Sequence, residues 1–260
     1  MSRSARTSGA RRMTGQPKSE DAIWMARVNL AAALRSANRL GLSEGICNHF
    51  SLVVPGGSGS FLLNPQGLHW SEICASDLII VDSDGNVVEG KYQVEPTALY
   101  IHSRIHTSKP AAKCVLHTHM PYATALCCVE NGRLEWAHQN ALRFYGRVSY
   151  DRNYNAQALD VAEGNRISEA SGGKDVLFLS HHGVVVTGGD LQTAFDDLYY
   201  LERACMLQVH ALSTGLRLEN ISTIVCETFV SQMNDVRKQG HLHFEALKRI
   251  LDREEPEYAD

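Results

Sequence analysis

Apolar residues recur every three or four positions in several long stretches of the chain, a spacing that places them on one face of an α-helix. The first stretch begins at Glu20 and stops before Gly41, a residue type that commonly follows the last turn of a helix. Pro96 and Pro121 suit the first turn of further helices, where a missing N–H breaks no helical hydrogen bond. The periodicity predicts helices from 20 up to 41, over 96–108, from 121 onward, and over 160–171, 191–212 and 225–251.

Shorter apolar runs bounded by turn residues predict β-strands. Ser-Asp-Gly at 83–85 separates two such runs closely enough for a hairpin, and the Gly- and Ser-rich loop 55–60 separates two others. The predicted strands cover 49–54, 61–63, 78–82, 86–88, 114–118, 176–179 and 184–187. Because hairpins join antiparallel strands, we expect an α/β fold whose mixed sheet is covered by helices.

The two parts of the chain differ in charge. Residues 1–19 hold five basic and no acidic residues, which leaves 20 basic against 29 acidic residues, a formal charge of −9, on 20–260. We expect 1–19 to be a disordered N-terminal tail, although an Arg- and Ser-rich segment without acids is also typical of an organelle transit peptide. No linker or repeat interrupts the remainder, so 20–260 is predicted to be a single domain.

Composition argues against several classes of partner. The net charge of −4 is unlike that of a nucleic-acid-binding protein. No apolar run approaches the roughly 18 residues of a membrane span, so no membrane partner is expected. Seven cysteines without a CxxC motif favour a reduced, cytoplasmic protein. The 12 histidines are the feature that points to chemistry.

Two groups of histidines follow predicted apolar strands. In His117-Thr118-His119 the two imidazoles are at positions i and i+2, so both point to the same face of a strand and can reach one ion. His181 and His182 follow the strand 176–179, and either could supply a third metal ligand beside Gly183. Gly183 allows a close backbone approach or a positive φ. The structural alternative is a set of hydrogen-bonded core histidines.

His102 and His106 are spaced i, i+4 on one face of the predicted helix 96–108. Such a pair could chelate a metal. Their apolar neighbours favour a packing role, or a role as hydrogen-bond partners of other histidines.

These motifs together resemble the class II (metal-dependent) aldolase/adducin head-domain family, over roughly residues 21–212. The resemblance implies a three-layer α/β/α domain with a mixed, largely antiparallel central sheet. It also implies a homotetramer with active sites between subunits. The matching segments are Cys47-Asn48-His49-Phe50-Ser51, Asn64-Pro65-Gln66-Gly67, Ile101-His102-Ser103 through Lys109-Pro110, Val115-Leu116-His117-Thr118-His119, and His182-Gly183.

By this resemblance His117, His119 and His182 are the metal ligands, with zinc the expected ion and iron or manganese as alternatives. The aldolases carry an acid/base carboxylate 19 residues before the first of these histidines, and Ala98 stands there. Glu95, three residues earlier, is the candidate catalytic residue, and a helix-terminus or solvated loop charge is its alternative reading.

The positions that bind the substrate phosphate in the family are also changed. His49, Gln66, Gly67 and Thr97 match them, so these are the candidate substrate-binding residues. They replace small donors that fit a phosphate dianion. The sequence therefore resembles the adducin-like branch, and we expect a small unphosphorylated substrate.

Three functions are compatible with this pattern. The first is a metal-dependent lyase that performs aldol cleavage or decarboxylation on a small carbonyl compound or hydroxy acid. The second is a non-heme iron oxygenase that decarboxylates an aromatic 2-oxo acid. The third is a non-catalytic module resembling adducin. For the second, an aromatic pocket could be lined by Trp70, Tyr92, Trp136, Phe144 and Tyr145, although core packing is the default interpretation of these residues.

Overall fold

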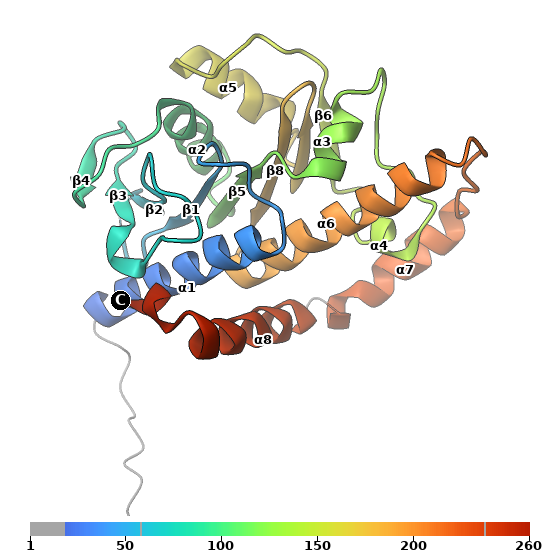
Figure 1. Cartoon of the computed structure of the whole chain (residues 1–260). Coiled ribbons are helices and arrows are strands. Elements are labelled where there is room, and N and C mark those ends of the chain that lie inside the picture. Colours follow the sequence, from blue (N-terminus) through green and yellow to red (C-terminus); the bar gives the residue numbers. More distant parts are fainter. Residues whose placement is uncertain (1–18, 58, 237) are drawn as a thin grey trace, which may run out of the picture.

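A single eight-stranded sheet forms the centre of the protein in a computed structural model that describes residues 19–57, 59–236 and 238–260 (Figure 1). The strand order is β4-β3-β2-β1-β5-β8-β7-β6. All neighbouring strands are antiparallel apart from β6 and β7, which are parallel, so the predicted mixed, largely antiparallel sheet is confirmed. The strands are β1 (His49–Val53), β2 (Phe61–Leu63), β3 (Ile79–Val81), β4 (Val87–Glu89), β5 (Cys114–Thr118), β6 (Val148–Asp151), β7 (Val176–Leu179) and β8 (Gly183–Gly188).

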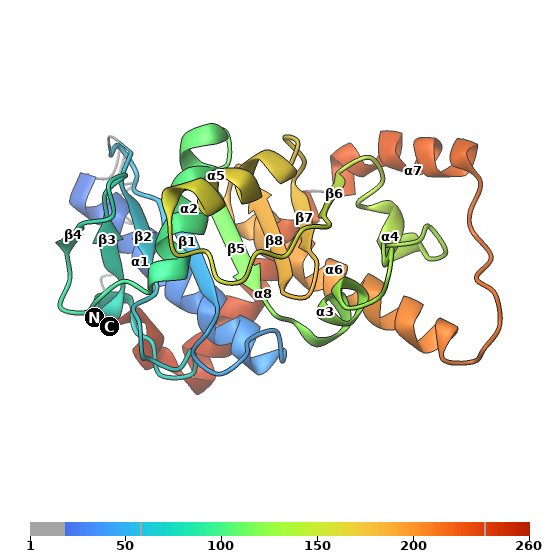
Figure 2. The same ribbon diagram turned by 90° about the horizontal axis from the view of Figure 1, so that it is seen from above.

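Helices cover both faces of this sheet, as the α/β/α prediction requires. Helices α1 and α6 lie against one face, with α8 packed on these two helices, and α2 and α5 pack together on the other face (Figures 1 and 2). The helices are α1 (Ser19–Arg39), α2 (Pro96–Ser108), α3 (Pro121–Cys127), α4 (Gln139–Leu142), α5 (Val161–Ala170), α6 (Leu191–Leu212), α7 (Thr223–Val236) and α8 (Lys238–Glu254), with short 3₁₀ turns at Ala75–Asp77 and Pro256–Ala259.

The central strand β5 divides its side chains between the two layers. Leu116 belongs to the hydrophobic cluster on the α1 and α6 side, whereas Val115 packs with Ile101 and other residues on the α2 and α5 side. Because side chains alternate along a strand, His117 projects to the same side as Val115. His49 lies directly across from His117 in the β1–β5 pairing. The sheet therefore presents its histidines beneath α2.

Glycine allows α5 to approach α2 closely. A Cβ at Gly164 would lie 2.6 Å from the backbone oxygen of Tyr100 and 2.8 Å from Cγ of Arg104. Real Cβ contacts are longer than this, so a larger residue would push the two helices apart. Because α2 begins beside the histidines, this contact helps to set the position of the first turn of α2.

The predicted single helix over 225–251 is wrong, because the structure has two helices there, α7 and α8. Gly240 and His243 bring α8 against Asp196 of α6, with His243 Nδ1 2.8 Å from Asp196 Oδ1. Helix α7 contacts α4 as well as α8, and Figure 2 shows it beside α4. The apolar periodicity over 225–251 is continuous, so the division into two helices follows from the packing of α8 on α6 and not from the local sequence.

Two elements have no counterpart in the sequence prediction. Strand β6 is mostly half-buried and pairs with β7 alone at the end of the strand order, so its sequence VSYD carries no apolar run. Helix α4 has four residues, too few to show a helical period.

Most of the predicted tail 1–19 lies outside the described residues, with α1 beginning at Ser19. The single-domain interpretation of 20–260 stays a prediction. Among the described residues, no helix has both the length and the apolar character needed to cross a bilayer.

Candidate metal centre and its pocket

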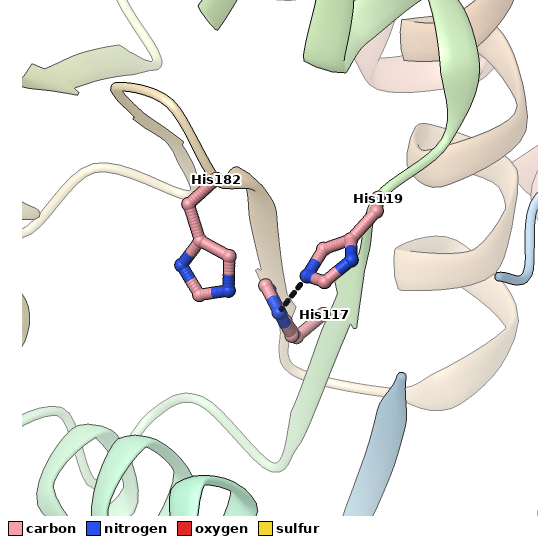
Figure 3. A group of neighbouring side chains, drawn as sticks. All are labelled: His117, His119 and His182. Carbon is pink, nitrogen blue, oxygen red and sulfur yellow. Dashed lines mark hydrogen bonds between the residues drawn. The ribbon is translucent and has the colours of Figure 1, made fainter. Parts of the chain in front are cut away.

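Three imidazoles meet where β5 ends beside the turn from β7 to β8 (Figure 3). His117 and His119 come from the end of β5 and His182 from the turn, and one nitrogen of each lies within 4.8 Å of the others. The ring centroid of His182 is 4.7 Å from that of His117 and 4.8 Å from that of His119. Among the described residues this is the group with the geometry to hold a metal ion.

The glycine after His182 makes this meeting possible. A Cβ on Gly183 would lie 2.5 Å from the backbone oxygen of Thr118 and 2.8 Å from Cδ2 of His119. Of the two roles considered for this glycine, close approach is therefore the one that the structure shows. The positive φ, 59°, belongs to His181, which is exposed.

The hydrogen-bond partners of two of these histidines fix their tautomers. His117 Nδ1 lies 3.0 Å from the carbonyl oxygen of Val184, which can only accept, so this nitrogen carries the proton. His119 Nδ1 lies 2.6 Å from Oε2 of Glu44, and it likewise donates. In the neutral rings the Nε2 atoms of both histidines therefore carry lone pairs.

These two Nε2 atoms are 3.2 Å apart (Figure 3). Two lone pairs at this distance repel each other unless a positive charge lies between or beside them. With Zn–N bonds of about 2.0–2.1 Å, two ligands on one edge of a tetrahedron are about 3.4 Å apart. The donor set therefore fits a divalent ion.

Burial keeps the rings of His117 and His182 neutral, as metal ligands must be. It lowers the pKa of His117 well below its ordinary value, and the neighbouring His182 and His49 add to the effect. Burial, followed by the charges of His119 and His49, lowers the pKa of His182 to about 4. At neutral pH neither nitrogen is blocked by a proton.

Glu95 and His49 form a pair beside the three histidines. The ring of His49 stacks on that of His117 with centroids 5.1 Å apart, and its Nε2 is 3.3 Å from Oε2 of Glu95. Glu95 is also the N-cap of α2, because the same oxygen accepts from Ala98 N at 2.7 Å and from the hydroxyl of Thr97 at 2.5 Å. Burial alone would raise the pKa of Glu95, but these hydrogen bonds outweigh it and lower the pKa to about 2. Glu95 is therefore a carboxylate at neutral pH.

His102 and His106 make a separate network behind the centre. His106 Nδ1 donates to the carbonyl of Ala112 at 3.0 Å, so its Nε2 accepts from Ser51 Oγ at 2.8 Å. The Ser51 oxygen then accepts from His102 Nδ1 at 2.6 Å. Neither histidine belongs to the three-imidazole group, and the packing interpretation describes both. His102 Nε2 and His49 Nδ1 are buried with no hydrogen-bond partner among the described residues.

A pocket of about 590 Å³ opens beside the three histidines. Three of the four candidate substrate-binding residues line it: His49, Gln66 and Thr97. Gly67 is not among the lining residues and occupies a turn with φ of 90°. The complete lining is Glu44, Ile46, Cys47, His49, Gln66, Glu95, Thr97, His119, Thr124, Tyr154, Ala156, Gln157, Ala158, His181 and His182.

The aromatic residues considered for the oxygenase do not form this pocket. None of the five residues lines it, and Trp70 is instead a core residue whose ring centroid is 4.6 Å from that of Phe50. Tyr154 and Glu44 line it although the sequence analysis singled out neither. Both lie in loops without periodicity, so no local pattern marks them.

The α/β/α fold with a mixed sheet and the three imidazoles at the end of the central strands together describe an α/β protein with a candidate metal centre. The family model described as "Class II Aldolase and Adducin N-terminal domain" matches residues 28–209. A Caulobacter vibrioides protein that carries the provisional name of an aldolase class 2 protein is 34% identical over 95% of this chain and 97% of that protein. The chain belongs to the class II aldolase and adducin family, as the sequence resemblance predicted.

Two further relatives mark the breadth of the family. Human beta-adducin is 30% identical over 87% of this chain, a match that covers 33% of the longer protein. The crystal structure of an aldolase II superfamily protein from Pseudomonas syringae superposes with a TM-score of 0.84 at 34% identity, covering 92% of this chain and 96% of that one.

Proposed function

We propose that this protein is a divalent-metal-dependent carbon–carbon lyase that acts on a small unphosphorylated carbonyl compound or hydroxy acid by aldol cleavage or decarboxylation. The observation that carries the proposal is the approach of the Nε2 atoms of His117 and His119 to 3.2 Å beside His182. A scaffold has no chemical need for imidazoles that converge in this way.

The three histidines would hold the ion, with zinc the expected metal and iron or manganese as alternatives. When bound, the ion supplies Lewis-acid stabilisation of the negative charge that develops on a substrate oxygen. The neutral state of the His117 and His182 rings leaves their lone pairs free for this purpose.

Glu95 is the candidate group for moving a proton, since it lines the pocket as a carboxylate. A pKa of about 2 means that it would accept a proton before it could donate one. It would also hold the Nε2–H of His49 at the pocket wall.

The chemistry of the pocket wall supports an unphosphorylated substrate. Among the described lining residues there is no lysine or arginine, and two are carboxylates, Glu44 and Glu95. A phosphate dianion needs cationic or converging N–H donors, whereas hydroxyl and carbonyl groups suit His49, Gln66 and Thr97. Ketose 1-phosphates should therefore not be cleaved with kcat/KM near ~10⁴ M⁻¹s⁻¹, the ordinary enzymatic range.

Metal analysis of the purified full-length protein by plasma mass spectrometry tests the proposal. We expect about one zinc per chain, and we expect the double variant His117→Ala/His119→Ala to lose it while far-UV circular dichroism stays unchanged. Substrates are then screened as unphosphorylated hydroxy acids and 2-oxo acids, with aldehyde and carbon dioxide release as readouts. Stoichiometric iron with oxygen consumption would favour the oxygenase instead.

A non-catalytic module is the second candidate, because beta-adducin is similar over most of this chain. A wild-type protein that takes up no divalent metal would favour it.

A homotetramer in the cytoplasm completes the proposal. The exposed apolar side chains of Leu216, Ile224 and Val225 near α7 support the oligomer. Sedimentation velocity at micromolar concentration would contradict this part if it gave a monomer.

A further inference from the structure

Glu44 reaches the candidate centre from a part of the chain that supplies none of the three imidazoles. It lies between α1 and β1, and its Oε2 is 2.6 Å from Nδ1 of His119. Its side chain is 65% exposed at the rim of the pocket, whereas that of His119 is 19% exposed. The contact therefore links a pocket-lining carboxylate to the back of a candidate ligand.

The backbone holds Glu44 in place even though its side chain is exposed. Its N–H donates to Oδ1 of Asn48 at 2.8 Å, and its carbonyl accepts from Cys47 N at 3.1 Å. Asn48 is buried, and its own carbonyl accepts from Asn64 Nδ2 at 3.1 Å. The loop is thus fastened to the residues that flank β1 and β2.

We propose that Glu44 is a positioning residue that fixes the tautomer of His119 and keeps its Nε2 available to the ion. The inference rests on the proposed metal-dependent function. While Glu44 accepts the proton on Nδ1, the lone pair of His119 is on Nε2. Without this acceptor the ring is free to carry its proton on Nε2 and to donate it to Nε2 of His117, 3.2 Å away. An ion would then have to displace a hydrogen bond between two of its own ligands.

The other histidine of this pair needs no such side chain. His117 Nδ1 is held by the backbone carbonyl of Val184, which every residue type at position 184 would provide. The tautomer of His119, in contrast, depends on a side chain, that of Glu44, so a substitution at position 44 can change it. As a carboxylate it also adds negative charge behind His119, which strengthens a neutral ligand toward a cation.

Two substitutions at Glu44 separate the hydrogen bond from the charge. Glu44→Gln keeps an oxygen that accepts from Nδ1 but removes the charge, and Glu44→Ala removes both. Glu72→Gln is the matched control, because Glu72 is another exposed loop carboxylate that accepts one hydrogen bond, from His69 N at 2.8 Å. Circular dichroism checks that each variant is folded.

The first measurement is the ¹⁵N NMR signature of His119 in the metal-free protein at pH 8, which distinguishes Nδ1–H from Nε2–H. The second is the zinc dissociation constant from competition with a chromophoric chelator. We expect Nδ1–H in the wild type, in Glu44→Gln and in Glu72→Gln, and a shift to Nε2–H in Glu44→Ala. Zinc affinity should fall by about 10- to 100-fold in Glu44→Ala, by less in Glu44→Gln, and not in the control.

An unchanged tautomer and an unchanged zinc affinity in Glu44→Ala would overturn the inference. The same holds if Glu44→Gln keeps the Nδ1–H form yet binds zinc as weakly as Glu44→Ala, since charge alone would then explain the loss. A wild-type protein that binds no divalent ion would contradict the proposed function, whereas the NMR measurement would still decide whether Glu44 sets the tautomer.

Discussion

Replacing Gly183 with alanine would place a methyl group where β8 passes the end of β5. The new Cβ would lie 2.5 Å from the Thr118 oxygen and 2.8 Å from His119 Cδ2. An ordinary contact between carbon atoms is about 3.5–4.0 Å, so one strand end must move by roughly 1 Å. Backbone groups on both sides leave no flexible side chain to absorb this shift at Thr118.

Two opposing terms decide the effect on stability. Alanine in a strand is favoured over glycine by ~0.5–1 kcal/mol through backbone entropy. Overpacking of a close contact costs ~1–3 kcal/mol. We therefore expect Gly183→Ala to lower the free energy of unfolding by about 1 kcal/mol, together with a loss of zinc affinity on the order of 10-fold or more because His119 is displaced.

Urea unfolding and zinc competition measure the two effects separately. Gly189→Ala is the matched control, because the nearest atom to its added Cβ is the oxygen of Ala111 at 4.0 Å. That variant should keep the zinc affinity of the wild type and should not lower the urea midpoint, because it has the same backbone-entropy gain without the close contact. If Gly183→Ala also keeps both, the close approach at Thr118 does not constrain the centre, and the reasoning fails.

Three further predictions concern acid/base chemistry and solvent. Glu95→Gln should lose ~1 kcal/mol of stability by weakening the N-cap of α2, and unaltered turnover and pH profile in this variant would exclude a catalytic role for Glu95. Burial raises the pKa of Asp175, but the opposite effect of Lys109 and Arg147 is larger. The pKa of the folded protein is therefore below its unfolded value. The resulting stability is present above about pH 4 and is lost as pH falls through the folded pKa, so the urea midpoints of the wild type and of Asp175→Asn should differ most at pH 6, and the difference should shrink as pH falls below about 4. A high-resolution crystal structure should show a buried water donating to His49 Nδ1 and His102 Nε2, and an empty, dry contact there would contradict the tautomers assigned to both rings.

Sequence patterns identified most of the sheet and the pair of His117 and His119 because each of these signals is local. The strand at Cys114–Thr118 is an apolar run, and the i, i+2 spacing of His117 and His119 follows directly from strand geometry. The choice of His182 over His181 came from family resemblance, because the turn between β7 and β8 decides which ring faces the centre. That turn places His181 at φ 59°, a conformation that no periodicity indicates.

The remaining features depend on contacts between distant segments. The separation of α7 from α8 follows from docking on Asp196, and the position of Glu44 follows from the pairing of β1 with β5. Glu95 could be named from the sequence, but its double engagement with His49 and with the first turn of α2 could not. Tertiary packing decides where such helices end and which distant side chains meet, and local residue preferences do not carry this information.

The candidate centre joins segments that lie far apart along the chain. His117 is bonded to Val184, 67 residues away, and His119 to Glu44, 75 residues away. Contacts with such long sequence separation form only after the middle strands of the sheet have met, which is a slow step in folding. An ion held there would stabilise interactions absent from the early stages, so it would retard unfolding far more than it would accelerate folding. The same imidazoles that serve chemistry would then slow the separation of the end of β5 from the turn between β7 and β8, and metal loss would shorten the lifetime of the folded state.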